Sequence, residues 1–155
     1  MNQRIMLTKP VFERLVEHLV FIEENTDTLA NFCFPDLPIE RENMRKLFRE
    51  YAVKIEDEFE RTVIINSPEK YRDTANLNEF PFVILGSQVR VADQSSSCST
   101  VFKLIHPIEQ SSRINEVTCL SALGKALFMK KVGSEAVVDT PARQKRYKIE
   151  TIRLL

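Results

Sequence analysis

Apolar residues in the first part of the chain recur at intervals of three and four, which is the spacing of one face of a helix. They form two stripes: Phe12, Leu15, Val16, Leu19 and Ile22, then Met44, Leu47, Phe48, Tyr51, Ile55 and Phe59. Two amphipathic helices with a short connection bury both stripes most simply by packing antiparallel. The pattern therefore predicts a helical hairpin over about residues 10–61.

Polar and proline residues predict where these helices end. Thr8 stands where a capping residue of the first helix belongs, and the polar run 25–28 predicts that this helix frays there. Two prolines follow in the segment 31–38, so the break between the helices falls in it. Asp36 or Leu37 then precedes the second helix, and Asp36 is the better capping residue.

The rest of the chain reads as short strands with one short helix. A polar, aperiodic segment separates it from the hairpin, which predicts a hairpin at 1–65, a linker at 66–81 and a second domain at 82–155. Strands are expected at 82–91, 101–105, 114–119, 136–139 and 147–154, and a helix capped by Ser121 at 121–128. The expected fold class is α+β, with an antiparallel sheet on which the helix lies.

Composition narrows the class of protein. The two halves differ in charge: residues 1–80 hold 11 basic and 16 acidic side chains, a net of −5, and residues 81–155 hold 11 and 6, a net of +5. That asymmetry predicts two modules with different partners, although small domains also scatter charge unevenly. Three distant cysteines and the lack of an apolar leader or membrane span predict a cytoplasmic protein without disulfides. Neither a metal-ligand spacing nor a catalytic constellation is present, so we expect no catalytic residues and no intrinsic metal.

The strand-rich half carries a recognisable order of motifs. They are 83–91 (VILGSQVRV), 120–128 (LSALGKALF), 131–134 (KVGS) and 147–152 (YKIETI). In this order they resemble the C-terminal domain of Gre-type transcription elongation factors, the GreA/GreB family. The segment 102–107 (FKLIHP) is similar to the related short-coil regulator Rnk.

The resemblance implies an antiparallel two-helix coiled coil followed by an FKBP-like domain. It further implies that the globular domain binds core RNA polymerase and that the coiled coil enters the secondary channel of the polymerase. In Gre factors two acidic residues at the tip of the coil help to hold a Mg²⁺ that drives cleavage of backtracked RNA. This chain departs from that pattern, because its arms are shorter by about one heptad and the tip motif GDLKEN is absent. The nearest local match is 36–43 (DLPIEREN).

Three sets of residues are candidates for function. Asp36, Glu40 and Glu42 would place carboxylates at the tip, near a Mg²⁺ shared with the polymerase, or would merely favour the positive N-terminal end of the second helix. Phe32, Phe34 and Leu37 would contact a partner there, or would fold back onto Leu29 and Met44. Lys125, Lys130, Lys131, Arg143, Lys145 and Arg146 give the C-terminal domain a basic side that faces nucleic acid or an acidic partner, or only water.

The resemblance predicts a regulator of transcription elongation and pausing, with core RNA polymerase as its partner. Nucleic acid would be met only indirectly, inside the elongation complex, and no membrane is involved. The chain itself is not expected to be an enzyme, because the polymerase performs the chemistry. The short arms and altered tip favour a non-cleaving, Rnk-like regulator over a stimulator of transcript cleavage. A prolyl isomerase of the FKBP type is a more distant alternative, since the domain has few aromatic residues to line a pocket.

Overall fold

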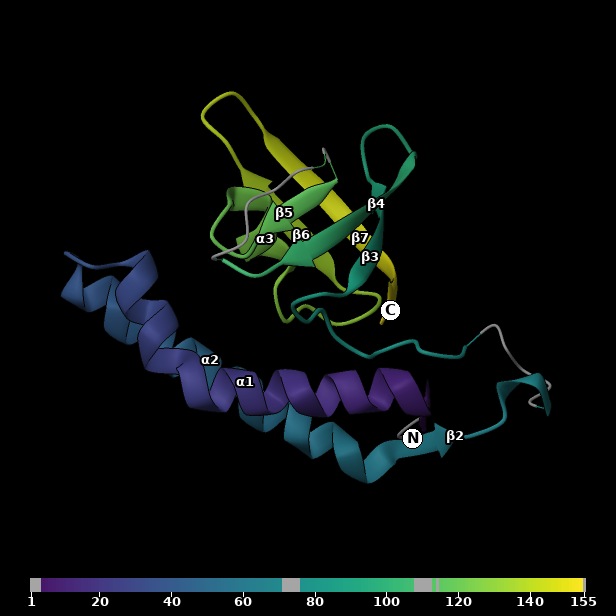
Figure 1. The fold of residues 1–155 in the computed structure, drawn as a ribbon. Helices are drawn as coiled ribbons and strands as arrows, with labels where there is room; N and C mark the ends of the chain where they lie inside the picture. Colours follow the sequence, from purple (N-terminus) through teal and green to yellow (C-terminus); the bar gives the residue numbers. More distant parts are fainter. Residues whose placement is uncertain (1–3, 71–75, 108–112, 114, 155) are drawn as a thin grey trace. The chain divides into compact units, whose positions relative to one another are not determined.

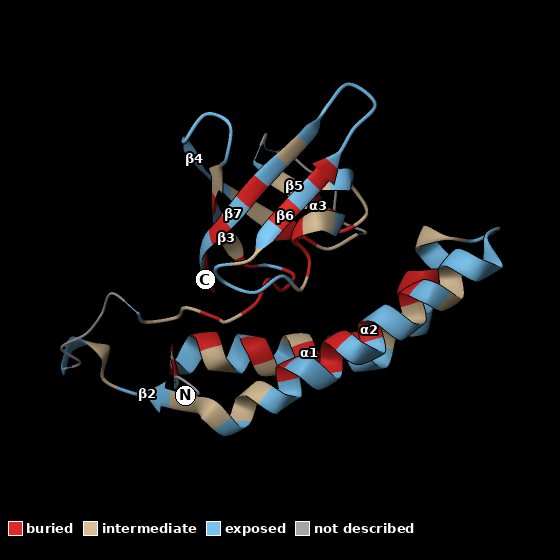
Figure 2. Cartoon of the chain, turned by 180° about the vertical axis from the view of Figure 1, so that it is seen from behind, coloured by how far each residue is buried: buried red, intermediate tan, exposed pale blue. Residues whose placement is uncertain are grey.

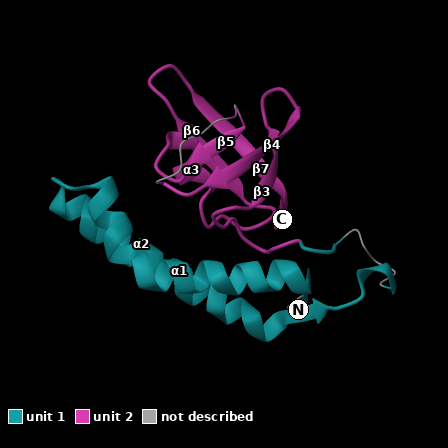
Figure 3. Ribbon diagram, in the orientation of Figure 1, with its two compact units in different colours: residues 1–78 teal, residues 79–155 magenta. Residues whose placement is uncertain are grey.

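The computed structural model describes residues 4–70, 76–107, 113 and 115–154. The chain divides into two compact units, Met1–Asn78 and Glu79–Leu155 (Figure 3). The first is helical apart from two short strands, and the second is a five-stranded sheet with one short helix (Figure 1). The fold class is therefore α+β, as the sequence pattern predicts.

The first unit is an antiparallel pair of long helices, α1 (Lys9–Cys33) and α2 (Pro38–Glu58). Their buried residues follow heptad-like spacing: Val11, Leu15, Leu19, Ile22, Leu29 and Ala30 on α1, and Met44, Phe48, Tyr51, Ala52 and Ile55 on α2 (Figure 2). Leu47, expected in this stripe, is 40% exposed instead. Because the opposite faces are charged, no helix in the described part of the chain is long and apolar enough to span a membrane.

Helix α1 continues through the polar run at which it was expected to fray. The side chains of Asn25 and Thr26 turn back along the helix and donate hydrogen bonds to the carbonyl oxygens of Phe21 and Ile22. These bonds satisfy the polar groups without withdrawing backbone groups from the helix ladder. The expectation was wrong for that reason, and the helix ends only at Cys33.

The base of the hairpin is closed by a parallel pair of strands, β1 (Ile5–Thr8) and β2 (Thr62–Ile65). A 3₁₀ turn, η1 (Phe59–Arg61), connects α2 to β2. Strand β1 lies before the helical hairpin predicted over about residues 10–61, and the sequence pattern did not predict it.

Asn78 completes this base. Its backbone N–H donates to the carbonyl of Met6 at 2.8 Å, and its side-chain Oδ1 accepts from the backbone N–H of Thr8 at 2.9 Å. Thr8 is the N-cap residue of α1, as expected, but its hydroxyl approaches Asn78 Oδ1 at 3.4 Å rather than capping the helix. These bonds join Asn78 to the start of α1. The segment between β2 and Asn78 includes the 3₁₀ turn η2 (Pro68–Lys70).

The second unit is built on one curved sheet. Its strands are β3 (Gln88–Asp93), β4 (Ser99–Ile105), β5 (Glu116–Thr118), β6 (Glu135–Asp139) and β7 (Gln144–Arg153), in the order β5-β4-β3-β7-β6. Neighbours are antiparallel except β4 and β5, which run parallel at one edge, so the expected antiparallel sheet is confirmed apart from that pair. The first expected strand also starts late: the chain turns at Gly86 (φ +88°), and β3 begins at Gln88.

The short helix α3 (Ala122–Leu127) is capped by Ser121, as predicted. The Ser121 hydroxyl accepts from the backbone N–H of Gly124 at 3.0 Å and donates to the carbonyl of Thr118 at 2.9 Å. The core of the unit lies between α3, the buried segment 82–85 and the inner face of the sheet, where Val89, Val91, Ile149 and Ile152 are fully buried.

Candidate functional site

The loop that joins α1 and α2 is held by arginine. The guanidinium of Arg41 donates to the carbonyl of Pro35 at 2.9 Å and approaches that of Phe34 at 3.5 Å. The backbone N–H of Phe34 bonds to Ala30, and that of Arg41 to Leu37. The last carbonyls of a helix carry partial negative charge, so a cation placed there stabilises the turn. This end of the hairpin, residues 32–42, is called the tip below.

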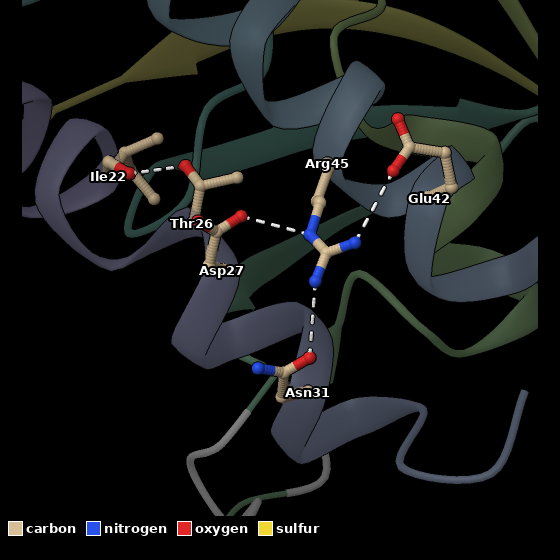
Figure 4. Close-up of polar contacts among 6 residues, drawn as sticks. All are labelled: Ile22, Thr26, Asp27, Asn31, Glu42 and Arg45. Carbon is tan, nitrogen blue, oxygen red and sulfur yellow. Dashed lines mark hydrogen bonds and ion pairs between the residues drawn. The ribbon is translucent and has the colours of Figure 1, made fainter. Parts of the chain in front are cut away.

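A second arginine ties the two helices together beside the tip (Figure 4). From α2, Arg45 reaches across to α1, where it bonds to the carboxylate of Asp27 at 2.9 Å and to the side-chain oxygen of Asn31 at 3.3 Å. It also pairs with Glu42, one turn earlier on its own helix, at 3.3 Å. The planar fork of a guanidinium spreads its N–H donors over three nitrogens and so reaches partners on both helices, whereas a lysine carries all its donors on one nitrogen.

The three candidate carboxylates at the tip are in different situations. Asp36 and Glu40 are exposed, and in the described part of the chain neither carboxylate takes part in an ion pair, whereas Glu42 is half-buried and paired with Arg45. Asp36 is not the helix cap, because Leu37 holds that position, so the preference for Asp36 was wrong. Glu40 lies in the first turn of α2, where the helix dipole favours an acidic residue.

A magnesium ion is not supported by these residues alone. No group of three or more acidic, histidine or cysteine side chains in the described residues is arranged to hold a metal. Arg41 and Arg45 also place positive charge at the tip, and Arg45 already uses Glu42. Cations repel a divalent ion at short range, so the arrangement does not fit a metal site built by this chain alone.

Apolar side chains project from the tip into solvent. Phe32 is 66% exposed and Leu37 is 50% exposed, while Phe34 is half-buried. The alternative in which these residues fold back to close the end of the hairpin is therefore wrong for Phe32 and Leu37. Ile39, which the sequence reasoning missed, is 73% exposed. Its position directly after Pro38, in the first turn of α2 and outside the buried stripe, was the available signal.

The basic residues of the C-terminal unit do not gather at one place. Lys130 and Lys131 precede the start of β6, and Arg143 follows its end. A five-residue strand separates these positions by about 16 Å at 3.3 Å per residue. Arg146 lies between them, opposite Val137, and pairs with Glu135 at 2.9 Å. Lys125 is exposed on α3.

Lys145 has a specific electrostatic neighbour. It lies near the carboxylate of Asp93, which also accepts hydrogen bonds from the backbone N–H and the hydroxyl of Ser95. The Ser95 bonds, with a smaller contribution from Lys145, hold the pKa of Asp93 below its usual value. This turn is therefore a satisfied structural element rather than a free basic surface.

The aromatic side chains of the second unit mostly lie inside it. Phe82, Phe128 and Tyr147 are buried, and half-buried Phe102 stacks edge-on against Tyr147 with ring centroids 6.3 Å apart. These rings fill the core instead of facing outward. Cys33, Cys98 and Cys119 form no disulfide with one another, and burial raises the pKa of the Cys33 thiol at the end of α1.

The family model that matches this chain covers its second unit. Residues 78–154 match the family model described as "Transcription elongation factor, GreA/GreB, C-term". The transcription elongation factor GreA of Rhodospirillum rubrum is 29% identical over 110 residues, 70% of this chain and 65% of that protein. GreA of Thermodesulfovibrio yellowstonii is 33% identical over 70 residues, 45% of this chain and 44% of that protein. The matches thus span about half to two thirds of the length of these relatives.

Solved structures of similar proteins cover nearly the whole chain. The GreA/GreB elongation factor of Nitrosomonas europaea is 20% identical with a TM-score of 0.45, over 98% of this chain and 99% of that one. Gfh1 of Thermus aquaticus is 22% identical with a TM-score of 0.43 over the same shares. These scores are below 0.5, so the family assignment rests on the sequence matches. Residues 78–154 therefore match the C-terminal domain of the GreA/GreB family of transcription elongation factors, and the relatives named GreA support that assignment.

Proposed function

We propose that this protein is a transcription elongation factor that binds core RNA polymerase and regulates elongation or pausing without stimulating transcript cleavage. The observation that carries the proposal is the match of residues 78–154 to the GreA/GreB C-terminal domain. The two-helix hairpin that precedes this domain supplies the slender element that the secondary channel of the polymerase admits. The relatives named as GreA support the elongation step as the stage of action.

The state of the tip favours regulation over cleavage. A cleavage stimulator of this family needs carboxylates that help to hold Mg²⁺, and here Glu42 is paired with Arg45 while Arg41 lies against the loop. Each guanidinium is always charged and opposes a divalent cation. In this proposal the hairpin acts by occupying the channel, and it competes with other factors that enter there.

Co-purification with core polymerase tests the partner. Tagged protein should retain core RNA polymerase from a bacterial extract, and purified polymerase should bind it in competition with a cleavage factor. Halted, backtracked elongation complexes then test the activity: RNA length should stay unchanged, and added cleavage factor should act more slowly. Failure to bind core polymerase would refute the proposal, whereas binding with shortened RNA would refute only its non-cleaving part.

One observation favours the alternative of a cleavage stimulator. Asp36 and Glu40 are both exposed, and no ion pair among the described residues engages either of them. If the alternative holds, the protein shortens backtracked RNA, and D36A and E40A each abolish the shortening while leaving polymerase binding intact.

A prolyl isomerase remains the distant alternative. That activity needs an open aromatic pocket, whereas Phe82, Phe128 and Tyr147 are packed in the core of the second unit. A proline-peptide isomerisation assay should give no rate above background, and a rate proportional to protein concentration would revive this alternative.

A further inference from the structure

The tip carries the two most exposed large apolar side chains of the described hairpin, Ile39 and Phe32, together with half-exposed Leu37. Phe32, Leu37 and Ile39 lie within eight residues of one another and are 66%, 50% and 73% exposed. Together they present on the order of 300 Å² of surface, similar to the largest apolar patch of a typical monomeric protein. A patch of this size at the far end of a hairpin indicates a contact surface.

The backbone under this patch is fixed before any partner arrives. Pro35 and Pro38 restrict φ on either side of the loop, and the guanidinium of Arg41 bonds to the Pro35 carbonyl at 2.9 Å. The bonds from Arg45 to Asp27 and Asn31 hold α1 and α2 together one turn further back. A surface that is already ordered loses little conformational entropy on binding. More of the free energy gained by burying its apolar side chains therefore appears as binding affinity.

Charge around the patch indicates what its partner looks like. Asp36 lies within the apolar set along the chain and Glu40 follows Ile39 directly, and both carboxylates are exposed. Burying the apolar side chains would bring these carboxylates to the rim of the contact. Electrostatic complementarity then requires basic groups around the partner's apolar pocket, since an acidic or purely apolar rim would leave them uncompensated.

We propose that Phe32, Leu37 and Ile39 form an apolar plug that seats in a basic-rimmed apolar pocket of core RNA polymerase. This inference rests on the proposed function and deepens it, because it assigns the affinity of the tip to burial of apolar surface rather than to a shared metal ion. Arg41 acts as a positioning residue, since it orders the loop that presents Leu37 and Ile39.

Matched substitutions test the plug. The tip variants are F32S, L37S and I39S, singly and combined, and the controls are L47S and V53S, which alter residues of α2 that are 40% and 56% exposed. Val53 lies fourteen residues beyond Ile39, about 21 Å along the helix, so it has the same chemistry outside the tip. Circular dichroism and thermal unfolding check that each variant keeps its helices. Affinity for purified core polymerase is measured by competition with labelled wild-type protein.

Each single tip variant should weaken binding about tenfold, as substitutions at the centre of an interface do, while the control variants stay within about twofold of the wild type. In a salt series D36N/E40Q should show a flatter dependence than the wild type, because the neutralised rim no longer attracts basic groups. R41M should also weaken binding, because the loop loses the bond that orders it, and unchanged affinity would refute the positioning role of Arg41.

The outcomes separate the two proposals. If the wild-type protein does not bind core polymerase, the proposed function fails and the plug fails with it. If the wild type binds and the combined tip variant binds equally well, only the plug is refuted. If sedimentation shows a concentration-dependent dimer of the wild type that the tip variants abolish, the patch is covered by a second copy of this chain, which also overturns the inference.

Discussion

Replacing Gly124 with alanine sets two physical effects against each other. Gly124 lies in α3, where alanine raises helix stability by about 1 kcal/mol over glycine. A Cβ at this position would lie 1.7 Å from the carbonyl oxygen of Thr118 and 2.7 Å from its carbonyl carbon. Both are backbone atoms of Thr118, the last residue of β5, so they cannot rotate away as a side chain would. Packing therefore predicts that α3 or the end of β5 must move.

The packing effect should exceed the helix effect. Forcing an extra methyl group into a filled site destabilises by about 1–3 kcal/mol, and a backbone overlap this close belongs at the upper end. Displacement of α3 also strains the Ser121 cap on the Gly124 N–H, which contributes about 1 kcal/mol. After the gain in helix propensity, we expect G124A to lower the free energy of unfolding of the second unit by about 2–3 kcal/mol.

Urea unfolding followed by NMR signals of residues in the second unit measures this change, because the two units need not unfold together. G133A is the matched control: Gly133 has φ +86° and open space where the new methyl group would lie, so alanine there meets only backbone strain of about 1 kcal/mol. G124A should be clearly less stable than G133A. If G124A is as stable as the wild type, or more stable, the packing argument is refuted and helix propensity is the larger effect.

Three other substitutions or treatments give distinct expectations. R45K should lower hairpin stability by about 0.5–1 kcal/mol in urea unfolding, because the single nitrogen of an ammonium cannot reach partners as widely spread as those of Arg45, and added salt should shrink the difference. S121A should cost the second unit about 1 kcal/mol through loss of the cap on α3, whereas S121D should restore part of it. A maleimide should label exposed Cys98 before partly buried Cys33, because the raised pKa of Cys33 lowers its reactive thiolate fraction, and Cys33 labelling should accelerate as pH rises. Equal rates at neutral pH would contradict that expectation.

The raised pKa of Cys33 also makes the stability of the hairpin depend on pH in a definite direction. Folding favours the neutral thiol of Cys33, so its contribution to stability is present below the unfolded-state pKa and is lost as pH rises through the folded-state pKa. Substituting Cys33 with serine should therefore reduce the loss of hairpin stability in the alkaline range, as followed by circular dichroism.

Local patterns were enough to predict the helices and the strand-rich half. The three-and-four spacing around Leu15 and Phe48 identified the buried faces of the hairpin, and Ser121 marked the start of α3 because capping acts over three residues. Motif order in the second half was sufficient to identify its family. Each of these features is encoded within about a dozen neighbouring residues, which is the range that periodicity and capping report.

Features that depend on distant partners were not predictable in the same way. Strand β1 is four residues long and pairs with β2 more than fifty positions away, so no local signal marks it. The parallel pairing of β4 and β5 depends on the path of the connection between them, not on the strand residues. At the tip, the hydrogen bond from Arg41 to the Pro35 carbonyl fixes the loop that carries Leu37. An arginine side chain has many rotamers, so this bond could not be predicted from the spacing of the two residues in the sequence.

The hairpin is fastened independently at its two ends, by β1 and β2 at the base and by Arg41 and Arg45 near the loop. Between these fastenings the helices repeat the same packing every seven residues. Removing or adding one repeat in both arms would shift the loop by about 10 Å and leave both fastenings unchanged. The length of the hairpin can therefore change by whole heptads while the structures at both of its ends stay the same.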